Sequence, residues 1–340
     1  MEKQFLDLAE HPQRLKDIFV RLGLADSNET PAVSPLTGGV SSGILRVDVR
    51  RGSYCLKQAL PQLKVEKVWK VPLERAFTEV QWLRTVAAIQ PGCVPTVLGE
   101  DRETTSFVMA YLGEGHRNWK ADLLNGQVDI KAARQVGDAL GKIHAATAKN
   151  SDLASRFATD DNFYAIRLEP YLVETARVHP TLAPRLQALV KRTQERRIAL
   201  VHGDVSPKNI LLGPQGPVFL DAECAWYGDP AFDLAFVLNH LMIKAMWMPP
   251  SAPALLSGFD ALRAAYFKHI DFEPQSDLDA RTTSLLPALA LARVDGKSPV
   301  EYLDEHTRQR LRAASIRLIE REAERLSALA SYWMNEVNKA

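Results

Sequence analysis

The sequence predicts an α+β protein with two lobes: a small β-rich lobe over residues 1–112 and a larger helical lobe over residues 113–340. Two observations support this. Short runs with strand character, separated by turns rich in glycine and serine, fill much of the first third of the chain. After residue 112 apolar residues recur with the 3.6-residue period of helices, and one island of strands and turns interrupts them. A chain of 340 residues is long enough for two such lobes.

The first lobe is expected to contain strands and two helices. Residues 1–23 have the apolar spacing of an amphipathic helix, and residues 72–89 have a second apolar face that includes Phe77, Val80 and Leu83. Strands are expected over residues 34–36, 43–49, 53–58, 96–98 and 106–112.

The second lobe is expected to be mostly helical. Two of its helices have clear start signals: Asp229 followed by Pro230, and Ser298, which begins the capping-box sequence Ser-Pro-Val-Glu. The island between the helices covers residues 200–223 and reads LVHGDVSPKNILLGPQGPVFLDAE. Helices are expected over residues 130–146, 164–178, 182–197, 231–246, 252–269, 278–294 and 299–337.

The composition excludes several classes of protein. Lys plus Arg total 42 and Asp plus Glu total 41, so we expect no nucleic-acid partner, which would require clustered positive charge. Three scattered cysteines without a CxxC pair argue against a disulfide framework or structural zinc. The charged N-terminus does not resemble a signal peptide, and no apolar run is long enough to span a membrane. We therefore expect a cytoplasmic protein without a membrane partner.

The island carries the spacing typical of phosphoryl transfer. Asp204 and Asn209 stand in an HxDxxxxN pattern, in which the aspartate faces the acceptor hydroxyl and the asparagine binds a metal ion. Asp221 follows twelve residues later and suits a second Mg²⁺ ligand, brought beside Asn209 by a strand between them. The alternative is that this stretch is merely a loop, but a loop does not explain the whole spaced set.

A nucleotide site would also need a phosphate-binding lysine and a partner glutamate. Lys57 lies in a strand-like run after a glycine-containing turn, and Glu79 lies on the following helix. Glu66 and Glu74 are weaker candidates for the partner, and both members of the pair could instead be ordinary surface residues. The turn over residues 36–43 is not GxGxxG, but its backbone N–H groups with the hydroxyls of Ser41 and Ser42 could cover phosphates; a plain hairpin is the alternative.

Asp233 is expected to be structural. It lies one turn into a predicted helix among apolar neighbours, where a carboxylate needs hydrogen-bond donors. The nearest donors would be backbone N–H groups of the turn that contains His202 and Asp204. The alternative is an aspartate that only favours the positive end of the helix dipole.

These motifs resemble the aminoglycoside phosphotransferase superfamily, which includes choline, homoserine and methylthioribose kinases. The resemblance rests on LVHGDVSPKNILL and FLDAECAWYGDPAFDLA. It implies a protein-kinase-like two-lobed fold that binds ATP and Mg²⁺ between the lobes. The superfamily further implies that residues 109–112, with Met109, Tyr111 and Leu112, form a hinge that binds adenine through backbone groups, and that His202 supports the catalytic loop. Glu223 resembles the second acid of the DxE sequence in methylthioribose-kinase-like members, where it would be a metal ligand.

The acceptor is expected to be small. Asp233 follows Asp221 by only 12 residues, which leaves no room for the activation segment of a protein kinase. Arg293, Asp295 and Trp226 could contact the acceptor, although a charged turn is usually solvated and a tryptophan is usually core. The sequence thus predicts ATP-dependent phosphorylation of a hydroxyl on an aminoglycoside-like compound, a sugar or an amino alcohol. A nucleotide-binding pseudokinase and a protein kinase are the alternatives, and the acceptor and the oligomeric state stay open.

Overall fold

The chain divides into two compact units, Met1–Glu114 and Gly115–Ala340, in a computed structural model that describes residues 5–36, 41–61 and 72–339. The first unit is built on an antiparallel sheet and the second is mostly helical, so the predicted α+β class is confirmed. The sequence placed the boundary after residue 112, close to the division after Glu114.

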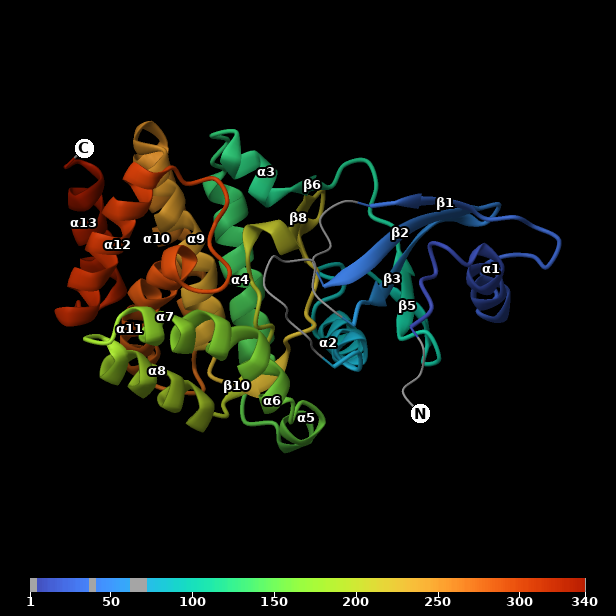
Figure 1. The fold of residues 1–340 in the computed structure, drawn as a ribbon, viewed down its shortest axis with the longest axis horizontal. Helices are drawn as coiled ribbons and strands as arrows, with labels where there is room; N and C mark the ends of the chain where they lie inside the picture. The colour runs from blue at the N-terminus through green and yellow to red at the C-terminus, as the bar shows by residue number, and fades with distance from the viewer. Residues whose placement is uncertain (1–4, 37–40, 62–71, 340) are drawn as a thin grey trace. The chain divides into compact units, whose positions relative to one another are not determined.

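The N-terminal unit is a five-stranded antiparallel sheet with two helices; Figure 1 labels both helices and the strands β1, β2, β3 and β5. The helices are α1 (Pro12–Arg21) and α2 (Arg75–Ile89). The strand order is β1-β2-β3-β5-β4, with the bounds β1 (Ala32–Pro35), β2 (Ser42–Val49), β3 (Gly52–Ala59), β4 (Val97–Asp101) and β5 (Ser106–Ala110).

Helix α1 covers one face of this sheet and is shorter than the predicted 1–23. Its residues Ile18 and Phe19 pack with Leu56 of β3 in the core of the unit. The described residues before α1, 5–11, are not helical: residues 8–10 form a turn, and Gln58 of β3 binds the segment. The N–H of Leu8 donates to Gln58 Oε1 at 3.0 Å, and Gln58 Nε2 donates to the carbonyl of Leu6 at 2.7 Å. Since residues alternate across a strand, Leu56 and Gln58 face α1, and Lys57 faces the opposite side.

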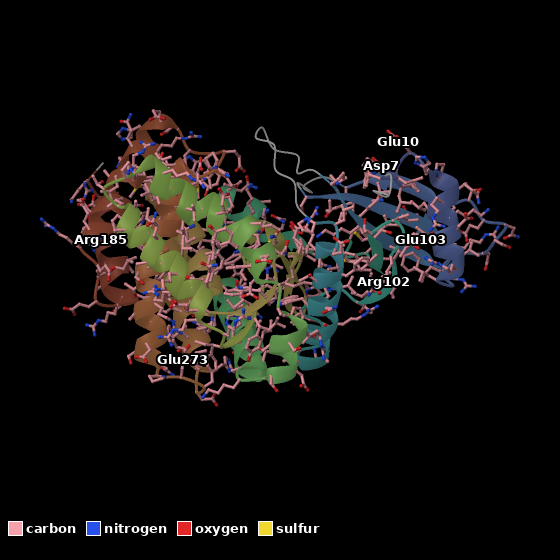
Figure 2. All side chains as sticks on the ribbon, turned by 60° about the horizontal axis from the view of Figure 1, so that its bottom comes forward. Asp7, Glu10, Arg102, Glu103, Arg185 and Glu273 are labelled. Atoms are coloured by element: carbon pink, nitrogen blue, oxygen red, sulfur yellow. The ribbon has the colours of Figure 1, made fainter. Side chains whose placement is uncertain are left out.

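The turn between β4 and β5 is tied to α1 by charge. Glu103, labelled in Figure 2, lies in this turn and pairs with Arg14 of α1. Asp101, at the end of β4, is buried and pairs with Arg21 at the other end of the helix. These ion pairs fix α1 on the sheet, so the helix and the strand that carries Lys57 form one unit.

The C-terminal unit packs its helices around α9 (Ala231–Trp247), nearly all of whose residues are buried. Figure 1 shows α11, α12 and α13 gathered at the end of the unit where the chain finishes. The other helices are α3 (Trp119–Leu124), α4 (Ile130–Thr147), α5 (Ser151–Arg156), α6 (Asp160–Phe163), the π-helix η1 (Tyr164–Val173), α7 (Glu174–Val178), α8 (Ala183–Glu195), the short 3₁₀ turns η2 (Pro207–Asn209) and η3 (Pro249–Ser251), α10 (Ala252–Phe267), α11 (Gln275–Asp295), α12 (Glu305–Glu320) and α13 (Leu326–Val337).

Residues 200–223, the predicted island of strands and turns, contribute to two small sheets. β7 (Ala199–Val201) pairs with β10 (Trp226–Gly228), and β6 (Arg117–Asn118), β8 (Ile210–Gly213) and β9 (Gly216–Phe219) form a second sheet. In the β8–β9 hairpin Ile210 lies opposite Phe219, and the N–H of Leu220 donates to the carbonyl of Asn209 at 2.9 Å. This register brings Asn209 to the same end of the hairpin as Asp221.

Two predicted helices differ from the observed ones. The segment 164–178 begins as a π-helix with Pro170 inside it, because a proline cannot donate the usual helical hydrogen bond. The segment 299–337 is two helices, and the first is capped by Asp304, whose Oδ1 accepts the N–H of Thr307 at 2.7 Å.

The capping box predicted at Ser298 is therefore wrong. The side-chain hydroxyl of Ser298 lies 3.0 Å from Nη1 of Arg293 instead, and Glu301 pairs with Lys120. The start signal at Asp229 predicts Pro230 as the first helical residue, but α9 begins one residue later, at Ala231. Oδ1 of Asp229 accepts the N–H of this first residue of α9 at 3.0 Å.

Candidate functional site

The loop after β7 is held by the buried carboxylate of Asp233 in α9. Oδ2 of Asp233 accepts the N–H of His202 at 2.7 Å, and Oδ1 accepts the N–H of Gly203 at 2.8 Å. His144 of α4 lies 3.2 Å from Oδ2. The contact predicted from the sequence is therefore present, and the carboxylate has partners on both oxygens, as complete burial requires.

Two further contacts fix the same loop. Gly203 has φ +81°, and a Cβ there would lie 2.8 Å from the carbonyl oxygen of Cys224, so the backbone demands glycine. The His202 ring accepts the N–H of Asp204 on Nδ1 at 3.1 Å, which leaves Nε2 to donate to the carbonyl of Leu220 at 3.1 Å. Burial lowers the pKa of His202, in agreement with this neutral form. His202 therefore joins the loop to the end of β9.

Asp204 is buried between two cations. Its Oδ2 lies 2.7 Å from Nη2 of Arg167, which is itself buried on the π-helix η1, and 3.4 Å from Nζ of Lys208. Burial opposes ionisation of this carboxylate, but the charges of Arg167 and Lys208 outweigh it and lower the pKa of Asp204. Arg167 also donates from Nε to the carbonyl of Gly203 at 2.5 Å. One guanidinium thus fixes the side chain and the preceding backbone of Asp204.

The predicted metal ligands lie at the end of the β8–β9 hairpin. Asn209 is buried, and its Nδ2 donates to the backbone carbonyl of Asp204 at 3.1 Å, so the amide oxygen is the atom free to act as a ligand. Asp221 is half-buried and has φ +67°, an unusual backbone conformation for a residue other than glycine. Glu223 is buried two residues further on, and its carbonyl accepts Nδ2 of Asn162 at 2.8 Å.

In the N-terminal unit, Lys57 and Glu79 form a buried ion pair. Nζ of Lys57 lies 2.6 Å from Oε2 of Glu79, and the two residues are 4% and 2% exposed. The rival Glu74 is exposed at the start of α2, and the rival Glu66 lies outside the described residues. Glu79 of α2 therefore pairs with Lys57, the lysine predicted from the sequence, on the face of β3 opposite α1.

The predicted phosphate-covering turn is described only in part, because residues 37–40 lie outside the described residues. Ser41 and Ser42 are both buried. The carbonyl of Ser41 accepts Nη2 of Arg75 at 2.6 Å and the N–H of Leu60 at 3.0 Å. These bonds join the start of β2 to the start of α2.

The predicted hinge lies at the end of β5. Met109 is buried and pairs across the sheet with Cys55 of β3, and the guanidinium of Arg46 lies 4.7 Å from the centre of the Tyr111 ring. Neither Tyr111 nor Leu112 donates a backbone hydrogen bond to any residue that the structure describes. Within the described residues, the backbone donors at this position are therefore unused.

The three predicted acceptor contacts are not brought together as one group. Trp226 has no exposed surface and stacks on Phe163 at 4.3 Å between ring centres, so it is a core residue of β10. Asp295 is occupied by His179 and Arg312, each at 2.8 Å. Arg293 donates to the hydroxyl of Tyr171 at 3.1 Å and to Ser298. The burial of Trp226 contradicts its predicted contact with the acceptor.

Sequence reasoning missed Arg167 and Lys208. Lys208 lies inside the quoted motif and could have been found from it, since it stands four residues after Asp204. Arg167 left one signal: an arginine flanked by Ile166 and Leu168, in a helix interrupted by Pro170. No local pattern connects it with Asp204, which lies 37 residues further along the chain.

Comparison with known proteins assigns this arrangement to a family. The sequence profile of the phosphotransferase enzyme family matches residues 32–275. The chain is 28% identical over 237 residues to a methylthioribose kinase of Pectobacterium atrosepticum, covering 61% of this chain and 56% of that protein. It is 27% identical over 238 residues to a methylthioribose kinase of Yersinia pestis, covering 62% and 56%. The chain therefore spans little more than half the length of these curated relatives.

Solved structures share the fold. A choline/ethanolamine kinase family protein from Mesorhizobium loti is 17% identical, with coverage of 96% of this chain and 99% of that one and a TM-score of 0.51. An ethanolamine kinase from Plasmodium vivax is 11% identical, with coverage of 96% and 86% and a TM-score of 0.54. These likenesses confirm the predicted kinase-like fold. None of the helices in the described residues is long and apolar enough to cross a membrane.

Proposed function

The chain belongs to the phosphotransferase enzyme family, and from this membership we propose that it transfers the terminal phosphoryl group of ATP to a hydroxyl group of a small molecule. The observation that carries the proposal is the position of Asp204. It is a buried carboxylate kept ionised by Arg167, on a loop whose backbone is fixed by Asp233. A buried charge held so rigidly is suited to aim a reacting group.

On the acceptor side, Asp204 accepts a hydrogen bond from the attacking hydroxyl. Because Arg167 binds Oδ2, the other carboxylate oxygen is left to face the acceptor. The hydroxyl oxygen forms a bond to the γ-phosphorus while the bond to the β–γ bridging oxygen breaks and ADP leaves. A carboxylate with a lowered pKa is a weak base, so Asp204 mainly orients the hydroxyl and receives its proton late in the transfer.

On the nucleotide side, Lys57 binds the α and β phosphates. Its pairing with Glu79 supports this role, since a buried ion pair fixes the ammonium group in one place. Ser41 and Ser42 stand at the base of the turn proposed to cover the phosphates. The backbone groups of Tyr111 and Leu112, next to Met109, are available to adenine.

Asn209 and Asp221 are the residues that would hold Mg²⁺, with Glu223 as a further candidate. The donor set fits this ion, because an amide oxygen and a carboxylate are hard ligands and Mg²⁺ takes its remaining ligands from phosphates and water. The described residues contain no cluster of three or more His, Cys, Asp or Glu side chains that could hold a metal ion alone. When bound, the cation would offset the charge that develops on the phosphate oxygens.

An acceptor screen by ADP release tests the proposal. The chain would be assayed with Mg-ATP over sugars, amino alcohols, hydroxy acids and aminoglycosides, and the product checked by mass spectrometry for one added phosphoryl group. We expect acceptor-dependent ADP release and a phosphorylated product. Binding of Mg-ATP without turnover on any acceptor would contradict the proposal and favour a nucleotide-binding module.

A further inference from the structure

Helix α9 carries a buried lysine that forms no ion pair with any described residue. Lys244 is 1% exposed, and its one hydrogen bond within the described residues is to the hydroxyl of Tyr302 at 3.3 Å. Its Nζ also lies 4.9 Å from the centre of the Tyr302 ring. A buried cation normally pairs with a carboxylate, because removing a charge from water is costly. The last turn of a helix favours a cation, but this interaction is too weak to offset that cost.

Most of the neighbouring charges that act on Lys244 are positive, and the nearby carboxylate of Glu301 offsets them only in part. Arg293 of α11 forms no ion pair with a described residue, and its Nε has no hydrogen-bond partner. Nε2 of His240, one turn before Lys244 on α9, is also buried and has no hydrogen-bond partner in the part of the chain that the structure describes. Lys120 of α3 is paired with Glu301, whose side chain is 64% exposed. Glu301 also acts on Lys244 and Arg293, but it is ion-paired with Lys120, and neither Lys244 nor Arg293 forms an ion pair with a carboxylate of the described residues.

This cluster, formed by Lys120, His240, Lys244 and Arg293, connects with Asp204 through aromatic rings. The guanidinium of Arg167, which binds Asp204, lies 6.0 Å from the centre of the Tyr171 ring, and the guanidinium of Arg293 lies 5.8 Å from the same ring. Phe236 lies under Arg167 at 5.8 Å and packs on the ring of His240 at 5.6 Å. Arg293 and His240 thus each contact an aromatic ring that Arg167, the partner of Asp204, also contacts.

We propose that this cluster binds an anionic oxygen group of the acceptor, a carboxylate or a phosphate, while the acceptor hydroxyl lies at Asp204. The proposal rests on the proposed function and names its substrate class: a small hydroxylated molecule with a negative charge. The anion supplies the ion-pair partner that Lys244 and Arg293 do not have among the described residues, and a neutral sugar or a cationic amino alcohol does not.

The protonation of Lys244 gives an independent sign of such binding. Burial, with the charges of Lys120 and Arg293, lowers the pKa of Lys244 to about 7. A bound anion stabilises the protonated ammonium and raises this pKa again. Binding near neutral pH therefore takes up a proton, which calorimetry detects as a dependence of the measured enthalpy on the buffer.

The experiment measures binding to the full chain of three anions and of the neutral counterparts of two of them. The probes are inorganic phosphate, D-gluconate with sorbitol, and ribose 5-phosphate with ribose, titrated by calorimetry into the millimolar range in two buffers. We expect at least one anion to bind the wild type with proton uptake, at least tenfold more tightly than its neutral counterpart. Lys244→Met, which keeps the side-chain volume, should weaken that binding at least tenfold.

Two controls separate anion binding at this cluster from binding at the protein surface and at the nucleotide site. Lys191→Met removes a solvent-exposed lysine on α8 and should leave anion binding unchanged. Lys57→Met affects the nucleotide site, so anion binding lost in that variant and kept in Lys244→Met would contradict the proposal. Absence of binding by all three anions, or equal binding of neutral probes, would overturn it as well. In those cases acceptor-dependent ADP release would still uphold the proposed function, which fails only if no acceptor is phosphorylated.

Discussion

The guanidinium of Arg167 binds the side chain of Asp204 by an ion pair of 2.7 Å to Oδ2 and the backbone just before it by a hydrogen bond of 2.5 Å to the carbonyl of Gly203. The arginine comes from a π-helix and the aspartate from the loop after β7. π-Helical segments often occur at functional sites, and this one carries the arginine that holds the carboxylate ionised.

Replacing Arg167 by methionine should lower turnover by about 10²-fold, because the carboxylate loses its position. Arg167 helps to lower the pKa of Asp204, so its loss should raise that pKa. The acidic limb of the pH profile of kcat should therefore move to higher pH. Arg167→Lys keeps the positive charge. In this variant the acidic limb should return closer to its wild-type position than kcat returns to its wild-type value. A profile that does not move in Arg167→Met would contradict the electrostatic role, even if the variant is slow.

Removing Asp221, the proposed metal ligand, should abolish the effect of Mg²⁺ on nucleotide binding. In the wild type we expect ATP to bind more tightly with Mg²⁺ than with a chelator present, since Asn209 and Asp221 would hold a cation that offsets the phosphate charge. In Asp221→Ala the two affinities should converge. Calorimetric titration of ATP with and without Mg²⁺ measures this difference, and an undiminished effect of Mg²⁺ in the variant would exclude Asp221 as a ligand.

Asp233→Ala should destabilise the protein by about 1 to 3 kcal/mol or more, because it leaves the backbone donors of His202 and Gly203 without an acceptor. Turnover should fall with it, since the loop is no longer fixed. The matched control is Asp277→Ala, an exposed aspartate in the first turn of α11, which should cost only about 0.3 to 1 kcal/mol. Equal changes in the free energy of unfolding for the two variants would remove the case for a bracing role of Asp233.

The stability of the unliganded protein should depend on pH through Lys244. The charged groups that act on it are Lys120 and Arg293, which lower its pKa, and Glu301, which raises it. Its pKa is about 7 in the folded state against an ordinary value of 10.5, so between these values the unfolded chain binds more protons. Stability from this group therefore rises with pH across that window and is lowest below it.

Lys244→Met isolates this contribution. Below pH 7 the variant should melt at a higher temperature than the wild type, by at least about 2 °C, because it no longer buries a charge. The difference should shrink as the pH rises towards 10.5. Thermal melts at a series of pH values measure it, and a variant that melts lower than the wild type at acidic pH would show that Lys244 stabilises the fold.

Much of this arrangement could be predicted from the sequence because its signals are local. The spacing from Asp204 to Asn209 identifies the loop, and the short hairpin that follows fixes where Asp221 falls. An aspartate inside an apolar helix needs donors, so the contact of Asp233 with the loop could be inferred from burial alone.

The remainder depends on contacts between distant segments. The partner of Arg167 is set by the packing of η1 against the loop, for which the sequence has no periodic signal. Ser298 matched a capping box, but Arg293 competes for its hydroxyl, and the helix begins later at Asp304. The residue type of Trp226 makes it a candidate for the acceptor site, but it is buried in the core, where it stacks on Phe163.

The conservative substitution Asp204→Asn tests whether this carboxylate positions the acceptor hydroxyl. Turnover and Mg-ATP affinity are measured on the same preparation. We predict that acceptor-dependent turnover falls by about 10² to 10⁴-fold, the usual contribution of a positioned acid or base. Mg-ATP should bind with nearly unchanged affinity, because Asp204 is assigned to the acceptor and not to the nucleotide. Near-normal turnover in the folded variant would contradict this role of Asp204 and the phosphoryl-transfer mechanism built on it.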